Sequence, residues 1–197
     1  VFMQLMAKRP GEVHIWDDDV VEEKNLDNQV FDVEHIGMCK VDALAHMAAR
    51  KFPRGKCNVV AHTVRVHEYT ELSGFVLAGV DSMTCRHEIF TAIQNGEVIC
   101  YIDGRTRIDG GKVYGIDPQN IGNIARYTDP THLPMDTMTT DIGACNAPSP
   151  APEIVTIVAG HMVARLCDWL LLESGDAKPF MNFYGFTFGS PRFAHHA

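Results

Sequence analysis

The feature that most constrains the fold is a continuous apolar run, residues 74–80, that ends in Asp81. An apolar run of this length without a polar break is typical of a strand buried on both faces in the centre of a parallel sheet. Ser82 follows directly and can cap a helix, which we expect to extend through Gln94. A buried strand that runs straight into a helix predicts an α/β fold.

The same alternation of strands and helices extends along the rest of the chain. Apolar residues 13–16 run into three consecutive aspartates, and residues 38–51 carry apolar side chains at helical spacing. Further strands are expected at 58–66, 98–102 and 181–188, a hairpin pairing 103–108 with 112–116, and helices at 2–8 and 153–172. The pattern predicts a doubly wound, mostly parallel, Rossmann-like sheet with an antiparallel extension, and a long crossover loop at 117–152.

Charge and cysteine spacing exclude several classes of protein. With 17 Lys and Arg against 25 Asp and Glu, the net charge is −8, which argues against a broad electrostatic surface for nucleic acid or anionic lipid. The apolar segment 154–172 contains His161, Arg165 and Asp168, so it is expected to be a buried helix rather than a membrane span. None of the 6 cysteines forms a Cys-x-x-Cys pair, which predicts reduced thiols in a cytoplasmic protein and no zinc.

Three short motifs follow one another in a fixed order. Asp17-Asp18-Asp19-Val20 ends the first strand, Asn25-Leu26-Asp27-Asn28-Gln29 follows, and Ile36-Gly37-Met38-Cys39-Lys40 precedes the helix. This order resembles the ThiF/MoeB/HesA family, the bacterial relatives of the ubiquitin-activating enzymes. In that family a strand ends Asp-x-Asp-x-Val, followed by Asn-Leu-x-Arg-Gln and Ile-Gly-x-x-Lys.

Two later features extend the resemblance from residue 12 to about residue 172. Gly79-Val80-Asp81 with Arg86 is similar to the family's aspartate at the end of a core strand. Cys145 precedes a Pro-led apolar helix, where the family often carries its working cysteine. We therefore expect a single ThiF-like adenylation domain over residues 1–197.

The resemblance implies an ATP-dependent reaction on a protein tail. ATP adenylates the C-terminal carboxylate of a ubiquitin-like or sulfur-carrier protein, pyrophosphate is released, and the acyl group can then pass to a cysteine. Homodimers are usual in the family. The face of helix 153–172 that carries small residues is the interface we expect.

The resemblance also implies roles for individual residues. Asp17, with Asp19 beside it, would accept hydrogen bonds from the ribose hydroxyls, and Lys40 would neutralise phosphate charge. Asp81 would hold Mg²⁺, which takes hard oxygen ligands. The remaining assignments are amide contacts to the phosphates from Asn25, Asn28 and Gln29, an anion contact from Arg86, and the acyl acceptor thiol of Cys145.

Each of these residues also has an ordinary structural interpretation. The acidic triplet could be a solvated turn, and Lys40 a surface residue of a helix. Asp81 could cap the next helix, Arg86 could form a structural ion pair, and Cys145 could be an inert small residue. The functional interpretation requires that Asp17, Asn25, Gln29, Lys40 and Asp81 converge on one crevice at one edge of the sheet.

Two departures from the family pattern bear on ATP use. Asn28 stands where the family has an arginine, so one cation is missing, and we expect either weaker ATP use or compensation by Arg86, Arg105 or Arg107. No glycine-rich phosphate loop is present. Because a central strand missing from a sheet leaves two unpaired edges, we expect an N-terminal strand and glycine loop outside residues 1–197, or donated by a partner chain. Residues 1–197 alone should then bind ATP poorly.

Two other functions stay open at this point. A degenerate, non-catalytic member that serves as a binding protein fits Asn28 and the missing loop. A nicotinamide-dependent oxidoreductase fits the general fold, but Asn25, Gln29 and Lys40 suit a triphosphate better than a nicotinamide.

Overall fold

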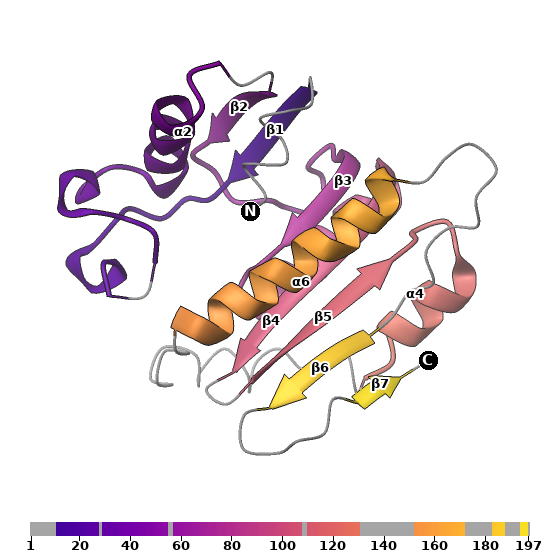
Figure 1. Cartoon of the computed structure of the whole chain (residues 1–197). Helices are drawn as coiled ribbons and strands as arrows, with labels where there is room; N and C mark the ends of the chain where they lie inside the picture. Colours follow the sequence, from indigo (N-terminus) through magenta and orange to yellow (C-terminus); the bar gives the residue numbers. More distant parts are fainter. Residues whose placement is uncertain are drawn as a thin grey trace. The chain divides into compact units, whose positions relative to one another are not determined.

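The computed structural model describes residues 11–27, 29–54, 57–107, 110–130, 152–171, 183–187 and 194–196. The expected helix at 2–8 lies outside them. The chain divides into two compact units, Val1–Val66 and His67–Ala197, and Figure 1 shows the elements of each.

The first unit is built on two parallel strands. β1 (Gly11–Trp16) pairs with β2 (Cys57–His62) in a register that sets Gly11 opposite Cys57 and Trp16 opposite His62. Between them lies helix α2 (Lys40–Lys51), which packs on β2. The predicted strand and helix of this unit are both present, but β2 ends four residues earlier than expected and α2 begins two residues later.

The stretch between β1 and α2 is more ordered than its irregular sequence suggests. It forms two short 3₁₀ helices, η1 (Glu23–Asn25) and η2 (Val33–His35). A small core holds them against α2: Val21, Phe31 and Ala43 are buried, with Leu26, Met38, Leu44 and Met47 packed around them. Gly37 has a φ of 88°, a left-handed conformation that costs glycine little, and its N–H donates to the Val21 carbonyl at 2.9 Å.

The second unit contains a five-stranded sheet. Its strands are β3 (Ser73–Ala78), β4 (Glu97–Arg107), β5 (Gly110–Ile116), β6 (Phe183–Thr187) and β7 (Ala194–His196), paired in that order. β3 and β4 are parallel, and the other neighbours are antiparallel. The expected antiparallel extension is therefore confirmed and reaches as far as β7. Two details were wrong: 98–102 and 103–108 form the single strand β4, and among the described residues β3 ends the sheet order instead of lying at its centre.

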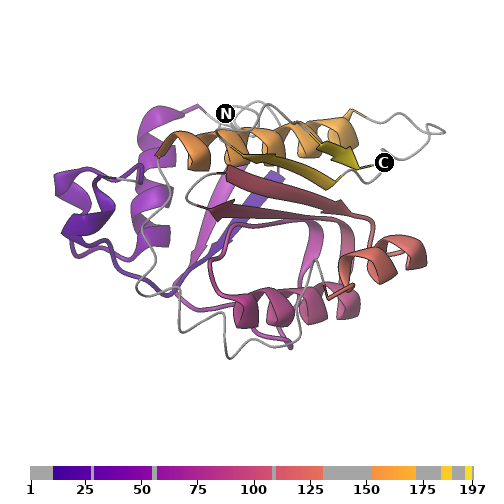
Figure 2. The same ribbon diagram turned by 90° about the horizontal axis from the view of Figure 1, so that it is seen from below.

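Helices cover both faces of this sheet, as Figure 2 shows. Helix α6 (Pro152–Leu170) packs on β4 and β5 from one side, and α3 (Met83–Asn95) and α4 (Ile121–Tyr127) pack from the other. α6 passes close to β4 at Gly104, where a Cβ would lie 2.2 Å from the Met162 sulfur. Within the described residues, no helix is both long and apolar enough to cross a membrane.

The sequence predicted two of these helices, α3 and α6, and missed the third, α4. Ser82 caps α3 as predicted, with its hydroxyl accepting from the Cys85 N–H at 3.3 Å. The buried face of α6 contains Ile154, Val158, Met162, Leu166 and Trp169, as its spacing predicts. Helix α4 was missed, because its seven residues are too few to show a helical period inside the predicted loop 117–152.

Candidate functional site

Asp17 lies immediately after the carboxyl end of β1. Its backbone N–H donates to the His62 carbonyl at 3.2 Å, which extends the parallel pairing by one residue and fixes where the side chain starts. One carboxylate oxygen accepts the Asp19 N–H at 2.8 Å. Partial burial raises the pKa of Asp17, and the Asp19 N–H and the Lys40 charge oppose that rise. A half-buried carboxylate at this edge is suited to accept hydroxyl hydrogen bonds.

Lys40 is held beside Asp17 from two directions. Its backbone N–H donates to the Asp19 carbonyl at 2.9 Å, which anchors the first residue of α2 to the acidic turn. Its ammonium forms an ion pair with Asp19 Oδ2 at 2.7 Å, and only 14% of its side chain is exposed. The Lys40 side chain is therefore held against the acidic turn. Asp19 acts here as the partner that positions the ammonium, while Asp18 pairs with Arg65 at 3.7 Å.

The side chains of Asn25 and Gln29, in the second motif, differ in burial. Asn25 is buried, and its side-chain oxygen accepts the Glu22 N–H at 2.8 Å in the capping box of η1. Gln29 is exposed, and its backbone N–H donates to the Asn25 carbonyl at 2.9 Å. Asn25 therefore shapes the turn that presents Gln29. Asn28 lies outside the described residues.

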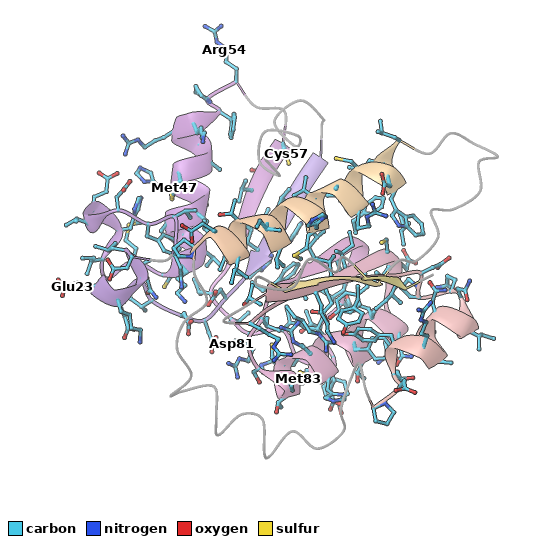
Figure 3. The ribbon with its side chains drawn as sticks, turned by 60° about the horizontal axis from the view of Figure 1, so that its bottom comes forward. Glu23, Met47, Arg54, Cys57, Asp81 and Met83 are labelled. Atoms are coloured by element: carbon cyan, nitrogen blue, oxygen red, sulfur yellow. The ribbon has the colours of Figure 1, made fainter. Side chains whose placement is uncertain are left out.

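Asp81 and Arg86 belong to the second unit. Asp81 is exposed in the connection between β3 and α3, beside Met83, the first residue of that helix (Figure 3). Because Ser82 provides the cap of α3, Asp81 does not serve as that cap. Arg86 is buried, where its guanidinium pairs with the Asp103 carboxylate and donates to the Val80 carbonyl. This is the structural ion pair that the sequence left open for Arg86.

A buried network around Asp103 was not anticipated from the sequence. Asp103 is fully buried and also accepts from Arg105 Nε at 2.7 Å and from the Tyr127 hydroxyl at 2.9 Å. The Arg105 guanidinium lies 4.5 Å from the centre of the Tyr114 ring. Burial, followed by the charge of Asp103, raises the pKa of Tyr127, which keeps the hydroxyl protonated. The available signal was the alternation Asp103-Gly-Arg105 inside an otherwise apolar strand.

The sequence-predicted residues thus gather at two strand ends. Asp17, Asp19 and Lys40 form one contact group after β1, and Asp81 follows β3, which pairs in parallel with β4. Their convergence on one crevice remains a prediction. Cys145 lies outside the described residues.

The donor chemistry at these positions suits a magnesium nucleotide. Among the described residues, two groups of acidic or histidine side chains have ligand atoms within 4.8 Å of one another: Asp17, Asp18 and Asp19, and Asp32, Glu34 and His35. Asp81 belongs to neither group. Mg²⁺ is commonly bound through one or two carboxylates, with phosphates and water completing the shell, so a lone aspartate fits that mode.

The family follows from a match that covers almost the whole chain. The model of the ThiF family matches residues 1–196. The chain belongs to the ThiF family. It has no significant match among curated protein sequences.

Solved structures with the same fold support the α/β, Rossmann-like architecture of this ThiF-family chain. PaaA is 15% identical with a TM-score of 0.69, over 99% of this chain and 65% of that one. MccB from E. coli with succinimide is 16% identical with a TM-score of 0.67, over 94% of this chain and 55% of that one. MccB from E. coli with AMPCPP and MccA is 15% identical with a TM-score of 0.68, over 94% of this chain and 55% of that one. The chain spans 55% to 65% of the length of these structures.

Proposed function

We propose that the complete protein uses ATP to adenylate the C-terminal carboxylate of a ubiquitin-like or sulfur-carrier protein in the cytoplasm. Membership of the ThiF family supports this, as do the similar structures of MccB, one with ATP and one with AMPCPP and MccA. The observation that carries the proposal is the arrangement after β1, where Asp19 holds the Lys40 ammonium beside the Asp17 carboxylate.

The nucleotide would be bound by groups of opposite charge. Asp17 would accept the ribose hydroxyls, and Lys40 would approach the phosphates, exchanging part of its pairing with Asp19 for a phosphate oxygen. Gln29 would add an amide donor from its exposed turn, which Asn25 holds in shape. Because Lys40 is mostly buried, its charge would be weakly screened, and this strengthens its effect on a phosphate.

Asp81 would hold the Mg²⁺ that accompanies ATP. The ion supplies positive charge against the phosphate oxygens as pyrophosphate departs. Asp81 is exposed in the connection after β3, so its carboxylate can be reached by the ion.

The reaction would proceed in two balanced steps. A carboxylate oxygen of the carrier tail attacks the α-phosphorus of ATP, which forms an acyl adenylate and releases pyrophosphate. In the second step the Cys145 thiolate attacks the acyl carbon, and AMP leaves as a thioester forms.

A degenerate, non-catalytic binding protein is the second candidate, and one observation favours it. Two of the three arginines expected to replace the missing cation at Asn28 are held by Asp103: Arg86 by its ion pair, and Arg105 through Nε at 2.7 Å. Redirecting either one would break a buried ion pair, which is costly. Arg107, the third of these arginines, is exposed on β4.

We also propose that the protein is a homodimer. Thr156, Ala159, Gly160 and Ala164 leave a side of α6 exposed that consists of small residues, where a second helix can approach closely. Light scattering of the complete protein tests this directly, and a monomeric mass at micromolar concentration would overturn it.

Pyrophosphate exchange tests the proposed function. The complete protein, with MgATP and a carrier ending in Gly-Gly, should exchange labelled pyrophosphate into ATP. Asp81→Ala should abolish exchange, whereas Glu71→Ala, at an exposed acid ahead of β3, should not change it. Nucleotide binding without exchange for any carrier would support the degenerate binding protein instead.

Cys145 is tested separately from adenylation. Cys145→Ala should leave pyrophosphate exchange intact and prevent a thioester that is sensitive to thiols. Loss of exchange in this variant would contradict its assignment as the acyl acceptor.

A further inference from the structure

Helix α3 ends on the only asparagine of the sequence that is followed by a glycine. Asn95 is the last residue of α3 and is exposed, and Gly96 is the residue at which the helix stops. The side-chain carbonyl carbon of an asparagine and the backbone nitrogen of the next residue can close a five-membered ring. A glycine in the second position permits this closure best, because no Cβ stands beside the attacking nitrogen.

The backbone N–H of Gly96 is not held by the helix. The residues that end α2 and α4, Phe52 and Thr128, donate their N–H groups to carbonyls four residues earlier, each at 2.9 Å. Within the described part of the chain, the Gly96 N–H forms no such hydrogen bond. Its backbone is extended, with φ −102° and ψ 178°, so the chain leaves the helix directly at this residue. No hydrogen bond to a carbonyl therefore has to break before the Gly96 nitrogen reacts.

Packing against the neighbouring strand fixes a glycine in this position. A Cβ on Gly96 would lie 2.2 Å from the Leu72 carbonyl oxygen and 3.3 Å from the Ala92 carbonyl oxygen. The Glu97 N–H donates to the same Leu72 carbonyl at 3.1 Å, just ahead of the β3–β4 pairing. A side chain at residue 96 would push these backbones apart. The residue that makes Asn95 reactive is thus also one that the fold favours.

We propose that Asn95 is a site of spontaneous deamidation through a cyclic imide. The Gly96 N–H loses its proton to hydroxide, and the nitrogen attacks the side-chain carbonyl carbon of Asn95. The bond from that carbon to the side-chain nitrogen breaks, and ammonia leaves with a proton taken from water. A second water then opens the imide at either carbonyl. Attack at the side-chain carbonyl gives aspartate, and attack at the backbone carbonyl gives isoaspartate.

Both products change the junction between α3 and the sheet. Each places a carboxylate at the C-terminal end of α3, where the helix dipole disfavours negative charge. The last turn of α3 contains no basic residue that would offset this charge. Isoaspartate also lengthens the backbone by one carbon between α3 and β4. Because Ser73 pairs with Glu97 at the start of the β3–β4 register, the extra carbon displaces the first pair of this ladder.

Peptide mass spectrometry of the complete protein, aged in buffer at pH 7 and at pH 9, tests the site. The peptide with Asn95 should gain the difference in mass between water and ammonia, and should do so faster at pH 9, because hydroxide removes the Gly96 proton. Isoaspartate is detected in the same peptide by methyl transfer from S-adenosylmethionine with isoaspartyl methyltransferase. Asn120 is the internal control, because it is exposed but precedes Ile121, and its side chain accepts the Asn123 N–H at 3.1 Å. It should keep its mass over the same time.

Asn95→Gln keeps the amide but disfavours ring closure, because its ring would have six members. This variant should keep its mass at residue 95 and form no isoaspartate there, and circular dichroism establishes that it is folded. The wild-type protein unfolded in urea gives the reaction of the chain without its fold. These readouts are covalent changes, so they do not depend on whether the protein adenylates a carrier. The proposal would be overturned if Asn95 stayed intact in the folded protein while the unfolded chain deamidated, or if Asn120 reacted as fast as Asn95.

Discussion

The Tyr127 hydroxyl donates to the buried carboxylate of Asp103 at 2.9 Å, which links α4 to β4 across the second unit. Asp103 also pairs with Arg86 from α3 and with Arg105 on its own strand. One carboxylate thus joins both helices on this face of the sheet. A buried charge with several partners is costly to disrupt, because removing it leaves the opposite charges uncompensated.

Asp103→Ala should destabilise the protein strongly. It leaves the Arg86 and Arg105 charges without their carboxylate, and we expect a loss of about 3–5 kcal/mol in the free energy of unfolding. Tyr127→Phe removes the hydroxyl that donates to Asp103 at 2.9 Å and accepts from Arg105 Nη2 at 3.2 Å, and should cost about 1.5–3 kcal/mol. Urea denaturation measures both values. A larger loss for Tyr127→Phe than for Asp103→Ala would contradict the central place of Asp103.

Asp17→Asn should separate stability from nucleotide binding. Burial raises the pKa of Asp17 above its ordinary value, so the folded state favours the protonated form. The stability from that form is present in acid and is lost as pH rises through the raised pKa. The neutral amide avoids this loss and keeps the acceptor for Asp19, so the variant should be at least as stable at pH 7. The difference should shrink in acid.

The same Asp17→Asn variant of the complete protein should bind ATP more weakly, because the charged acceptor for the ribose hydroxyls is gone. Thermal unfolding at pH 4 and 7, with and without ATP, measures both effects. A variant that is less stable at pH 7 and binds ATP normally would show that Asp17 has a structural role only.

Lys40→Met should weaken ATP binding by the complete protein. A charge-assisted hydrogen bond contributes about 1.5–3 kcal/mol, which corresponds to a loss of affinity of roughly 10–100-fold. Lys51→Met is the matched control, because Lys51 is the exposed last residue of the same helix. Calorimetric titration with MgATP compares the two variants, and equal affinities would remove Lys40 from the site.

Two glycines should respond in opposite directions to alanine. A Cβ on Gly96 would lie 2.2 Å from the Leu72 carbonyl oxygen, so Gly96→Ala forces the backbone to move and should cost about 1–3 kcal/mol. A Cβ on Gly160 in α6 meets nothing within 4 Å. Gly160→Ala should stabilise the helix by about 0.5–1 kcal/mol. Thermal unfolding compares them, and similar shifts would contradict the packing described for Gly96.

The sequence predicted elements with strong local signals. The apolar run before Asp81 became β3, Ser82 capped α3, and the apolar face of α6 matched its spacing. The place of each strand in the sheet was harder to predict, because the apolar pattern of a buried strand does not show which strands pair with it.

Side-chain partnerships were the least predictable part. The ordered motifs located Asp17, Asp19 and Lys40, and the structure joins them. Arg86 was assigned to an anion because nothing nearby in sequence revealed Asp103, 17 residues later, as its partner. Nδ1 of His14 and Nε2 of His62 are hydrogen-bonded at 2.9 Å across 48 residues, a contact that depends on the parallel register of β1 and β2. Such contacts are set by tertiary pairing, which local patterns do not encode.

The proposed nucleotide site requires that the groups after β1 and β3 meet around one nucleotide. A crystal structure of the complete protein with AMPCPP and Mg²⁺ tests this most directly. We expect Asp17 within hydrogen-bond distance of the ribose hydroxyls, Lys40 against the phosphates, and Asp81 in the magnesium shell. A nucleotide bound elsewhere, with Asp17 and Asp81 both in contact with solvent alone, would contradict the account.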